Sequence, residues 1–166
     1  MISVIIPVKN DREIENTLNE MFNIPEPEKT EILVLDASEG NLDDIKKKFP
    51  KVRWVYFKNN TNKTYTFTEQ INLDLHKAKG EIIVFIDAYC FPKKDWLVEL
   101  TKPIRNGSEN YVTGRGVSSK GKSFHDATWG ESIKYRSDTG SANTAFKKKI
   151  LFDIGYYDED FEAGSD

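Results

Sequence analysis

The chain has 166 residues, about the size of one domain, and its 27 acidic and 24 basic residues leave a formal net charge of −3. This acidic balance excludes the basic surface typical of proteins that bind nucleic acid, and a single cysteine excludes an intramolecular disulfide framework. The most apolar stretches, Val4–Val8 and Ile82–Ile86, are far shorter than the roughly 20 residues that a membrane span needs. We therefore expect no transmembrane segment and no nucleic-acid partner. The expected location is the cytoplasm, either free or at the periphery of the inner face of the membrane.

Short runs rich in β-branched residues alternate with helical patterns over the first half of the chain. The runs predict four buried strands: Ile2–Val8, Glu31–Asp36, Val52–Phe57 and Glu81–Asp87. Apolar residues at helical spacing predict three helices between them: Asp11–Phe22, Leu42–Phe49 and Thr66–Lys79. Because strand and helix alternate, the strands are expected to pair in parallel through crossovers. The sequence therefore predicts an α/β fold, a three-layer α/β/α sandwich with a twisted, mainly parallel sheet.

Individual residues suggest where the helices begin and end. Asp11 can cap the first helix, and Gly80 is placed to end the third. Beyond the fourth strand, we expect a helix around Asp95–Leu100 and a strand around Tyr111–Gly114. The polar stretch from Arg115 to Ser141 is longer than an ordinary connection, so it is either a functional flap or contains a short element.

Polar residues follow three of the four predicted strands. The first strand leads into Lys9-Asn10-Asp11, the second into Asp36-Ala37-Ser38 and the fourth into Asp87-Ala88-Tyr89. In open parallel sheets, ligands bind at the carboxyl ends of the strands, where the following helices begin. Each carboxylate alone also suits a helix cap or a turn. Together they predict a ligand site at one edge of the sheet.

Four segments resemble, in order, the successive motifs of the family 2 glycosyltransferases, which are inverting nucleotide-sugar enzymes with the GT-A fold. They are ISVIIPVKND, EILVLDASEG, KGEIIVFIDAYCFPKKDWL and GSANTAFKKKILFDIGYYDEDFEAGSD. The resemblance implies a single Rossmann-like GT-A domain over residues 1–166 that binds a nucleotide-diphosphate sugar, with a UDP-sugar as the first expectation. It also implies transfer with inversion to a hydroxyl of a carbohydrate or lipid-linked acceptor. Family members normally continue with acceptor-side helices, so this chain resembles an N-terminal portion.

The resemblance also implies a role for each matching residue. Asp36 would accept a hydrogen bond from the base, and Asp87 would hold the ribose and the diphosphate. Asn143 would lie on the acceptor side. Asp166 would be the catalytic base, which takes the proton from the acceptor hydroxyl opposite the leaving nucleotide. Further residues would line the nucleotide-sugar pocket: Pro7, Val8, Lys9, Asn10 and Ala88.

The family resemblance implies a Mg²⁺ or Mn²⁺ cofactor at Asp87, because a divalent cation usually neutralises the leaving diphosphate. The family's Asp-x-Asp motif, however, stands here as Asp87-Ala88-Tyr89. A phenol with a pKa near 10 is a poor ligand for these cations at neutral pH. We therefore predict weak metal dependence. The family also often has Ala-Arg-Asn where this chain has Gln70-Ile71-Asn72, and Lys63, Arg115 or Lys120 could supply the missing cation that faces the diphosphate.

Two alternative functions remain open at this stage. A catalytically weak module that binds a nucleotide or glycan would suit Tyr89 and a chain that ends at Asp166. A terminal residue is poorly restrained, so we expect the isolated chain to bind donor but to transfer little sugar. A nucleotidyltransferase is disfavoured, because Pro7-Val8-Lys9-Asn10 stands where such an enzyme has a glycine-rich phosphate loop.

Overall fold

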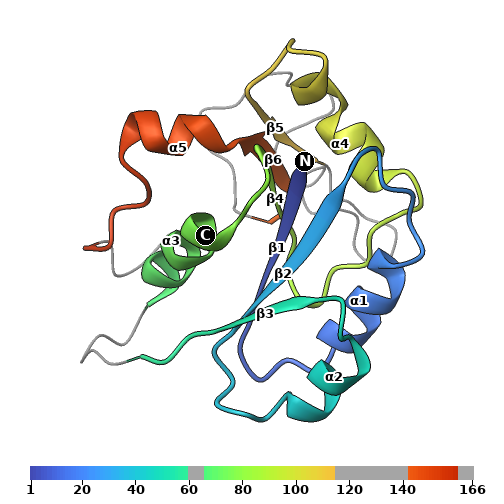
Figure 1. Cartoon of the computed structure of the whole chain (residues 1–166), viewed down its shortest axis with the longest axis vertical. Coiled ribbons are helices and arrows are strands. Elements are labelled where there is room, and N and C mark those ends of the chain that lie inside the picture. The colour runs from blue at the N-terminus through green and yellow to red at the C-terminus, as the bar shows by residue number, and fades with distance from the viewer. Residues whose placement is uncertain (60–65, 115–141, 161–166) are drawn as a thin grey trace, which may run out of the picture.

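The computed structural model describes residues 1–59, 66–114 and 142–160, which form six strands and five helices (Figure 1). The elements follow one another in this order: β1 (Ile2–Val8), α1 (Ile14–Met21), β2 (Thr30–Asp36), α2 (Asp43–Lys48), β3 (Arg53–Tyr56), α3 (Phe67–Lys77), β4 (Ile82–Phe85), α4 (Trp96–Arg105), β5 (Tyr111–Thr113), β6 (Thr144–Lys147) and α5 (Lys148–Ile154). The predicted strands and helices of the first half are confirmed, with shorter bounds for most of them.

The strands form one sheet in the order β3-β2-β1-β4-β6-β5. The first four strands pair in parallel, as their helical crossovers predict. β6 lies between β4 and β5 and is antiparallel to both. The prediction of a mainly parallel sheet is confirmed. The strand β6 is the exception, because it runs opposite to its two neighbours.

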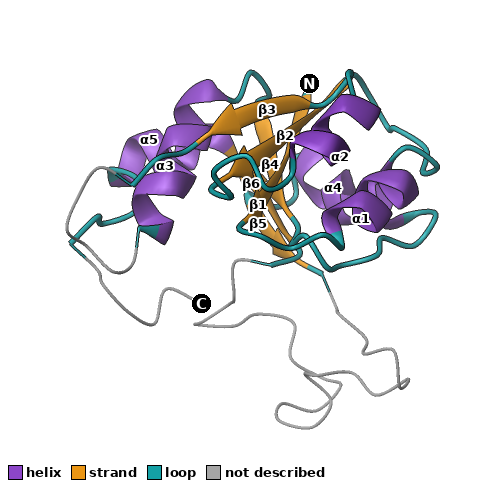
Figure 2. Cartoon of the chain, turned by 90° about the horizontal axis from the view of Figure 1, so that it is seen from below, coloured by secondary structure: helices purple, strands orange, loops and turns teal. Residues whose placement is uncertain are grey.

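Helices cover both faces of the sheet, with α1, α2 and α4 on one side and α3 and α5 on the other (Figure 2). The alternation of side chains along β1 shows why, since Val4 and Ile6 pack towards the first group and Ile5 towards the second. All three are fully buried, and burial of such a side chain stabilises a fold by roughly 1.5–3 kcal/mol. The predicted three-layer sandwich is confirmed.

The helix α4 extends past its predicted end at Leu100 and contains Pro103. Its buried residues continue at helical spacing to Ile104, so packing of this stripe outweighs the backbone hydrogen bond that proline cannot make. The strand β5 confirms the strand expected around Tyr111. Within the described ranges, none of the helices has the length and apolar character that crossing a membrane requires.

The boundary roles predicted for Asp11 and Gly80 were wrong. The helix α1 begins at Ile14, and the carboxylate of Asp11 instead accepts the Glu13 N–H at 2.9 Å, closing a turn ahead of the helix. The helix α3 ends before Ala78, which is extended. Gly80 is needed for a different reason, because a Cβ there would lie 2.5 Å from the backbone nitrogen of Ser3 in β1.

Candidate functional site

The carboxyl ends of β1, β2 and β4 meet at one edge of the sheet, as the register shows. Val8, the last residue of β1, pairs with Asp36, the last residue of β2. Because β6 is antiparallel to β4, its first residue Thr144 pairs with Phe85, the last residue of β4. Asn143 therefore lies at the same edge as the loops that follow β1, β2 and β4. The fold brings all of the described predicted site residues to this edge, which we call the donor edge.

The loops after β1 and β2 are joined by side-chain hydrogen bonds. The Asn10 N–H donates to Ser38 Oγ at 2.8 Å, and Asn41 Nδ2 donates to Asn10 Oδ1, also at 2.8 Å. Asn10 has a φ of 59°, a left-handed conformation that asparagine tolerates better than most residues. Lys9 and Asn10 are both exposed. The two loops thus form one braced polar surface, in which the bridging role of Ser38 was not predicted.

Asp36 is placed at the donor edge but is only 2 % exposed. Its Oδ1 accepts the Ser38 N–H at 2.8 Å, which closes a turn directly after β2. The loops after β1 and β2 thus leave little of the carboxylate accessible from outside. The turn accounts for the aspartate locally, and its contact with a base stays a prediction.

The loop after β4 is held both to a neighbouring helix and to itself. Thr17 Oγ1 of α1 donates to the carbonyl oxygen of Ala88 at 2.6 Å, and the Cys90 N–H donates to the carbonyl oxygen of Asp87 at 3.0 Å. The Tyr89 hydroxyl donates to Asp87 Oδ2 at 2.9 Å although its side chain is 59 % exposed. Burial, with the nearby Asp87 charge, raises the pKa of the Cys90 thiol, which favours its protonated form.

Asn143 links three elements at the start of β6. Its Oδ1 accepts the Trp96 Nε1–H of α4 at 2.7 Å, and its carbonyl oxygen accepts the Gly114 N–H at 2.7 Å. A Cβ at Gly114 would lie 2.5 Å from Asn143 Nδ2, so a larger residue there would push this amide away from its bond with Trp96. Asn143 thus has a structural role that sequence spacing did not indicate. Its role on the acceptor side stays a prediction.

The helix α3 holds the segment that follows α5. Asn72 is buried, and its Nδ2 donates to the carbonyl oxygen of Tyr157 and to Glu159 Oε1, both at 2.9 Å. The Tyr157 N–H donates back to Asn72 Oδ1 at 3.1 Å. This pairing fixes the backbone at Tyr157 and Glu159.

Four predicted residues lie outside the described ranges: Lys63, Arg115, Lys120 and Asp166.

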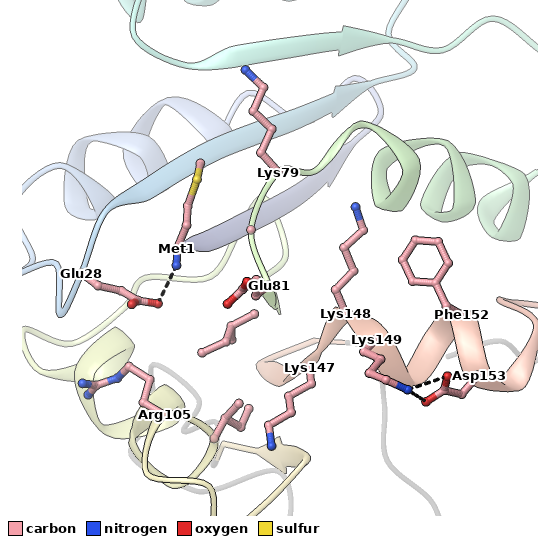
Figure 3. A pocket seen from close by; sticks show the side chains of 13 residues that line it. Met1, Glu28, Lys79, Glu81, Arg105, Lys147, Lys148, Lys149, Phe152 and Asp153 are labelled. Carbon is pink, nitrogen blue, oxygen red and sulfur yellow. Dashed lines mark hydrogen bonds and ion pairs between the residues drawn. The ribbon is translucent and has the colours of Figure 1, made fainter.

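A cavity of about 970 Å³ lies at the opposite edge of the sheet, where β1 and β4 begin and β6 ends (Figure 3). None of the predicted site residues lines it. Two ion pairs neutralise part of its charge, between the Met1 amino group and Glu28 at 3.2 Å and between Lys149 and Asp153 at 2.6 Å. Figure 3 shows other lysines of the lining extending in different directions, so their charges do not converge on one ligand.

Comparisons with known proteins point to one family. The model of the family "Glycosyl transferase family 2" matches residues 3–157. Glycosyltransferase AglE of Haloferax volcanii is 25 % identical over an aligned length of 180 residues. The alignment covers 99 % of this chain and 58 % of AglE.

Two solved structures share the fold. Mannosyltransferase PcManGT from Pyrobaculum calidifontis, in complex with GDP-Man and Mn²⁺, has a TM-score of 0.73 at 22 % identity, over 96 % of this chain and 48 % of its own. S. aureus TarS 1–349 in complex with UDP-GlcNAc has a TM-score of 0.71 at 22 % identity, over 99 % of this chain and 50 % of its own. These similarities confirm the GT-A fold, and the chain spans about half the length of these relatives. The chain belongs to glycosyl transferase family 2.

Proposed function

We propose that this chain is the donor-binding domain of an inverting glycosyltransferase, which moves a sugar from a nucleotide-diphosphate donor to a hydroxyl acceptor. Membership of family 2 supports sugar transfer from a nucleotide sugar. The observation that carries the proposal is the convergence of the loops after β1, β2 and β4, with Asp36 and Asp87, at one edge of the sheet. Ligands of open α/β sheets bind at this edge.

The donor edge offers suitable contacts for each part of a nucleotide sugar. Uracil and guanine both have a ring N–H that can donate a hydrogen bond to a carboxylate such as Asp36. Asp87 would hold the ribose. Lys9 is an exposed cation beside the braced Asn10 loop and suits a phosphate. The related structures contain UDP-GlcNAc in TarS and GDP-Man in PcManGT. We propose a UDP-sugar as the first donor to test.

The proposed catalytic base is Asp166, because inversion requires a carboxylate on the face opposite the leaving nucleotide. Asn72 holds Tyr157 and Glu159 against α3, and these residues precede Asp166 in the same family motif. The proposed acceptor is a hydroxyl of a carbohydrate or of a lipid-linked glycan. A lipid-linked acceptor would suit the expected peripheral position at the inner face of the membrane.

Replacing Asp36 by asparagine tests the donor site. The amide keeps the shape of the side chain and can still accept the Ser38 N–H, but it lacks the charge that strengthens a bond to the base. We expect the affinity for UDP, measured by calorimetry, to fall by roughly 1.5–3 kcal/mol. The matched control is Asp153→Asn at the opposite edge, which should leave the affinity unchanged. Equal affinity of the Asp36→Asn variant and the parent would remove Asp36 from the site.

A binding module without transferase activity is the second candidate. The hydrogen bond from the Tyr89 hydroxyl to Asp87 Oδ2 favours it, because this bond engages a carboxylate oxygen of the family's Asp-x-Asp motif. The two candidates differ in turnover. A transferase releases UDP from a UDP-sugar when a suitable acceptor is present, whereas a binding module holds the donor without consuming it. Detection of released UDP therefore separates them.

A further inference from the structure

The position of the family's Asp-x-Asp motif is occupied here by an aspartate and a tyrosine that bind each other. The Tyr89 hydroxyl donates to Asp87 Oδ2 at 2.9 Å. The turn between them is fixed, because Thr17 of α1 holds the Ala88 carbonyl oxygen and the Cys90 N–H holds that of Asp87. The exposed Tyr89 side chain is thus held against Asp87 by an anchored backbone and by its own hydrogen bond.

This donor set does not fit a Mg²⁺ or Mn²⁺ ion. Such cations prefer several anionic or carbonyl oxygens, and Mg²⁺ sites are built on carboxylates in particular. A phenol of ordinary pKa offers a cation no negative charge at neutral pH, and the Tyr89 hydroxyl directs its proton at one of the two Asp87 carboxylate oxygens.

We propose that the diphosphate of the donor binds here without a resident divalent cation, and that Tyr89 is the residue that determines this metal independence. The proposal rests on the proposed function, since it concerns the same donor edge. The diphosphate charge is then met by lysine side chains. Lys9 after β1 and Lys93 and Lys94 after β4 are exposed cations in the loops concerned, and lysine binds phosphate as a point charge.

Titration of the chain with Mn²⁺ alone, followed by the electron paramagnetic resonance of the free ion, tests the proposal directly. We expect no stoichiometric Mn²⁺ binding by the parent chain. The Tyr89→Asp variant restores the second carboxylate and should bind the ion through the pair with Asp87. The Tyr89→Phe variant is the matched control, because it removes the hydroxyl without adding a ligand and should not gain Mn²⁺ binding.

UDP calorimetry with Mn²⁺ or with a chelator supplies the second measurement. The parent's affinity should change by less than about threefold, whereas that of Tyr89→Asp should rise by about tenfold or more with Mn²⁺. Stoichiometric Mn²⁺ binding by the parent, a tenfold loss of parent UDP affinity on chelation, or a Tyr89→Asp variant that gains no Mn²⁺ binding would each overturn the proposal. Absence of UDP binding under every condition would instead contradict the proposed function, and the titration with Mn²⁺ alone would still decide the role of Tyr89.

Discussion

The Asp74→Asn variant is expected to be more stable than the parent by roughly 4 kcal/mol at pH 8 and by only about 1.5 kcal/mol at pH 5. Asp74 lies on the face of α3 that packs into the core with Ile71 and Leu75, and it is fully buried. Neither carboxylate oxygen has a hydrogen-bond partner among the described residues. Burial raises the pKa of Asp74 to about 7, against the smaller opposing effect of the Arg53 charge.

The direction of the pH dependence follows from this raised pKa. In the unfolded chain the carboxyl ionises near its ordinary value of 3.8, whereas in the folded chain it stays protonated to about pH 7. The unfolded state therefore gains charge first, and the parent loses stability as the pH rises from about 4 to 7. Above pH 7 the loss is complete. Asparagine resembles the neutral acid and does not titrate, so the variant avoids this loss.

Urea unfolding of the two chains at pH 5 and pH 8 measures the effect. Other titrating groups are common to both chains, so the difference between them isolates Asp74. The matched control is Asp153→Asn, an exposed carboxylate paired with Lys149, for which the difference should be small at both pH values. A difference between the parent and Asp74→Asn that does not grow between pH 5 and pH 8 would contradict a raised pKa.

The Gly80→Ala variant is expected to lose about 3 kcal/mol of stability. A Cβ at this position would meet the backbone nitrogen of Ser3 at 2.5 Å and the carbonyl carbon of Ile2 at 2.7 Å. These atoms belong to β1, which is paired on both sides by β2 and β4 and cannot shift without breaking either ladder. The Gly80 N–H also donates to Ser3 Oγ at 2.8 Å, a bond that any displacement would weaken.

Thermal or urea unfolding of Gly80→Ala gives the loss, and Gly107→Ala is the matched control. Gly107 has a positive φ of 81°, but a Cβ added to it would meet no atom within 4 Å, so its substitution should cost only the backbone strain, about 1 kcal/mol. A Gly80→Ala loss no larger than that of Gly107→Ala would mean that the close approach to β1 is relieved at little cost.

The layered fold could be predicted from the sequence because its signals are local. The buried strands are continuous apolar runs, and α1 and α3 carry apolar residues at helical spacing. The pairing of β6 between β4 and β5 could not be predicted in this way, because it joins Thr144 to Phe85 across a long stretch of chain. The role of Gly80 was missed for the same reason, since its contact with Ser3 exists only in the folded sheet.

The candidate site could be predicted in part. Carboxylates at the ends of β2 and β4 are visible in the sequence, and parallel pairing places Asp36 and Asp87 at one edge. The hydrogen bonds that brace them depend on side chains from other elements, such as Thr17 with Ala88. Asp74 shares the helical spacing of Ile71 and Ala78, a signal that could have revealed a buried acid, but a charged residue in a helix is ordinarily expected to be exposed to solvent.

Nuclear magnetic resonance of the ¹⁵N-labelled chain titrated with UDP tests the central claim most directly, because it reports which edge of the sheet the nucleotide contacts. We predict that the perturbed amides lie in the loops after β1, β2 and β4, including Asn10, Ser38 and Ala88. The amides of Glu81 and Lys147, at the cavity on the opposite edge, should be unaffected. Perturbations confined to that cavity, or no perturbation at saturating UDP, would contradict a donor site at the carboxyl edge of the sheet.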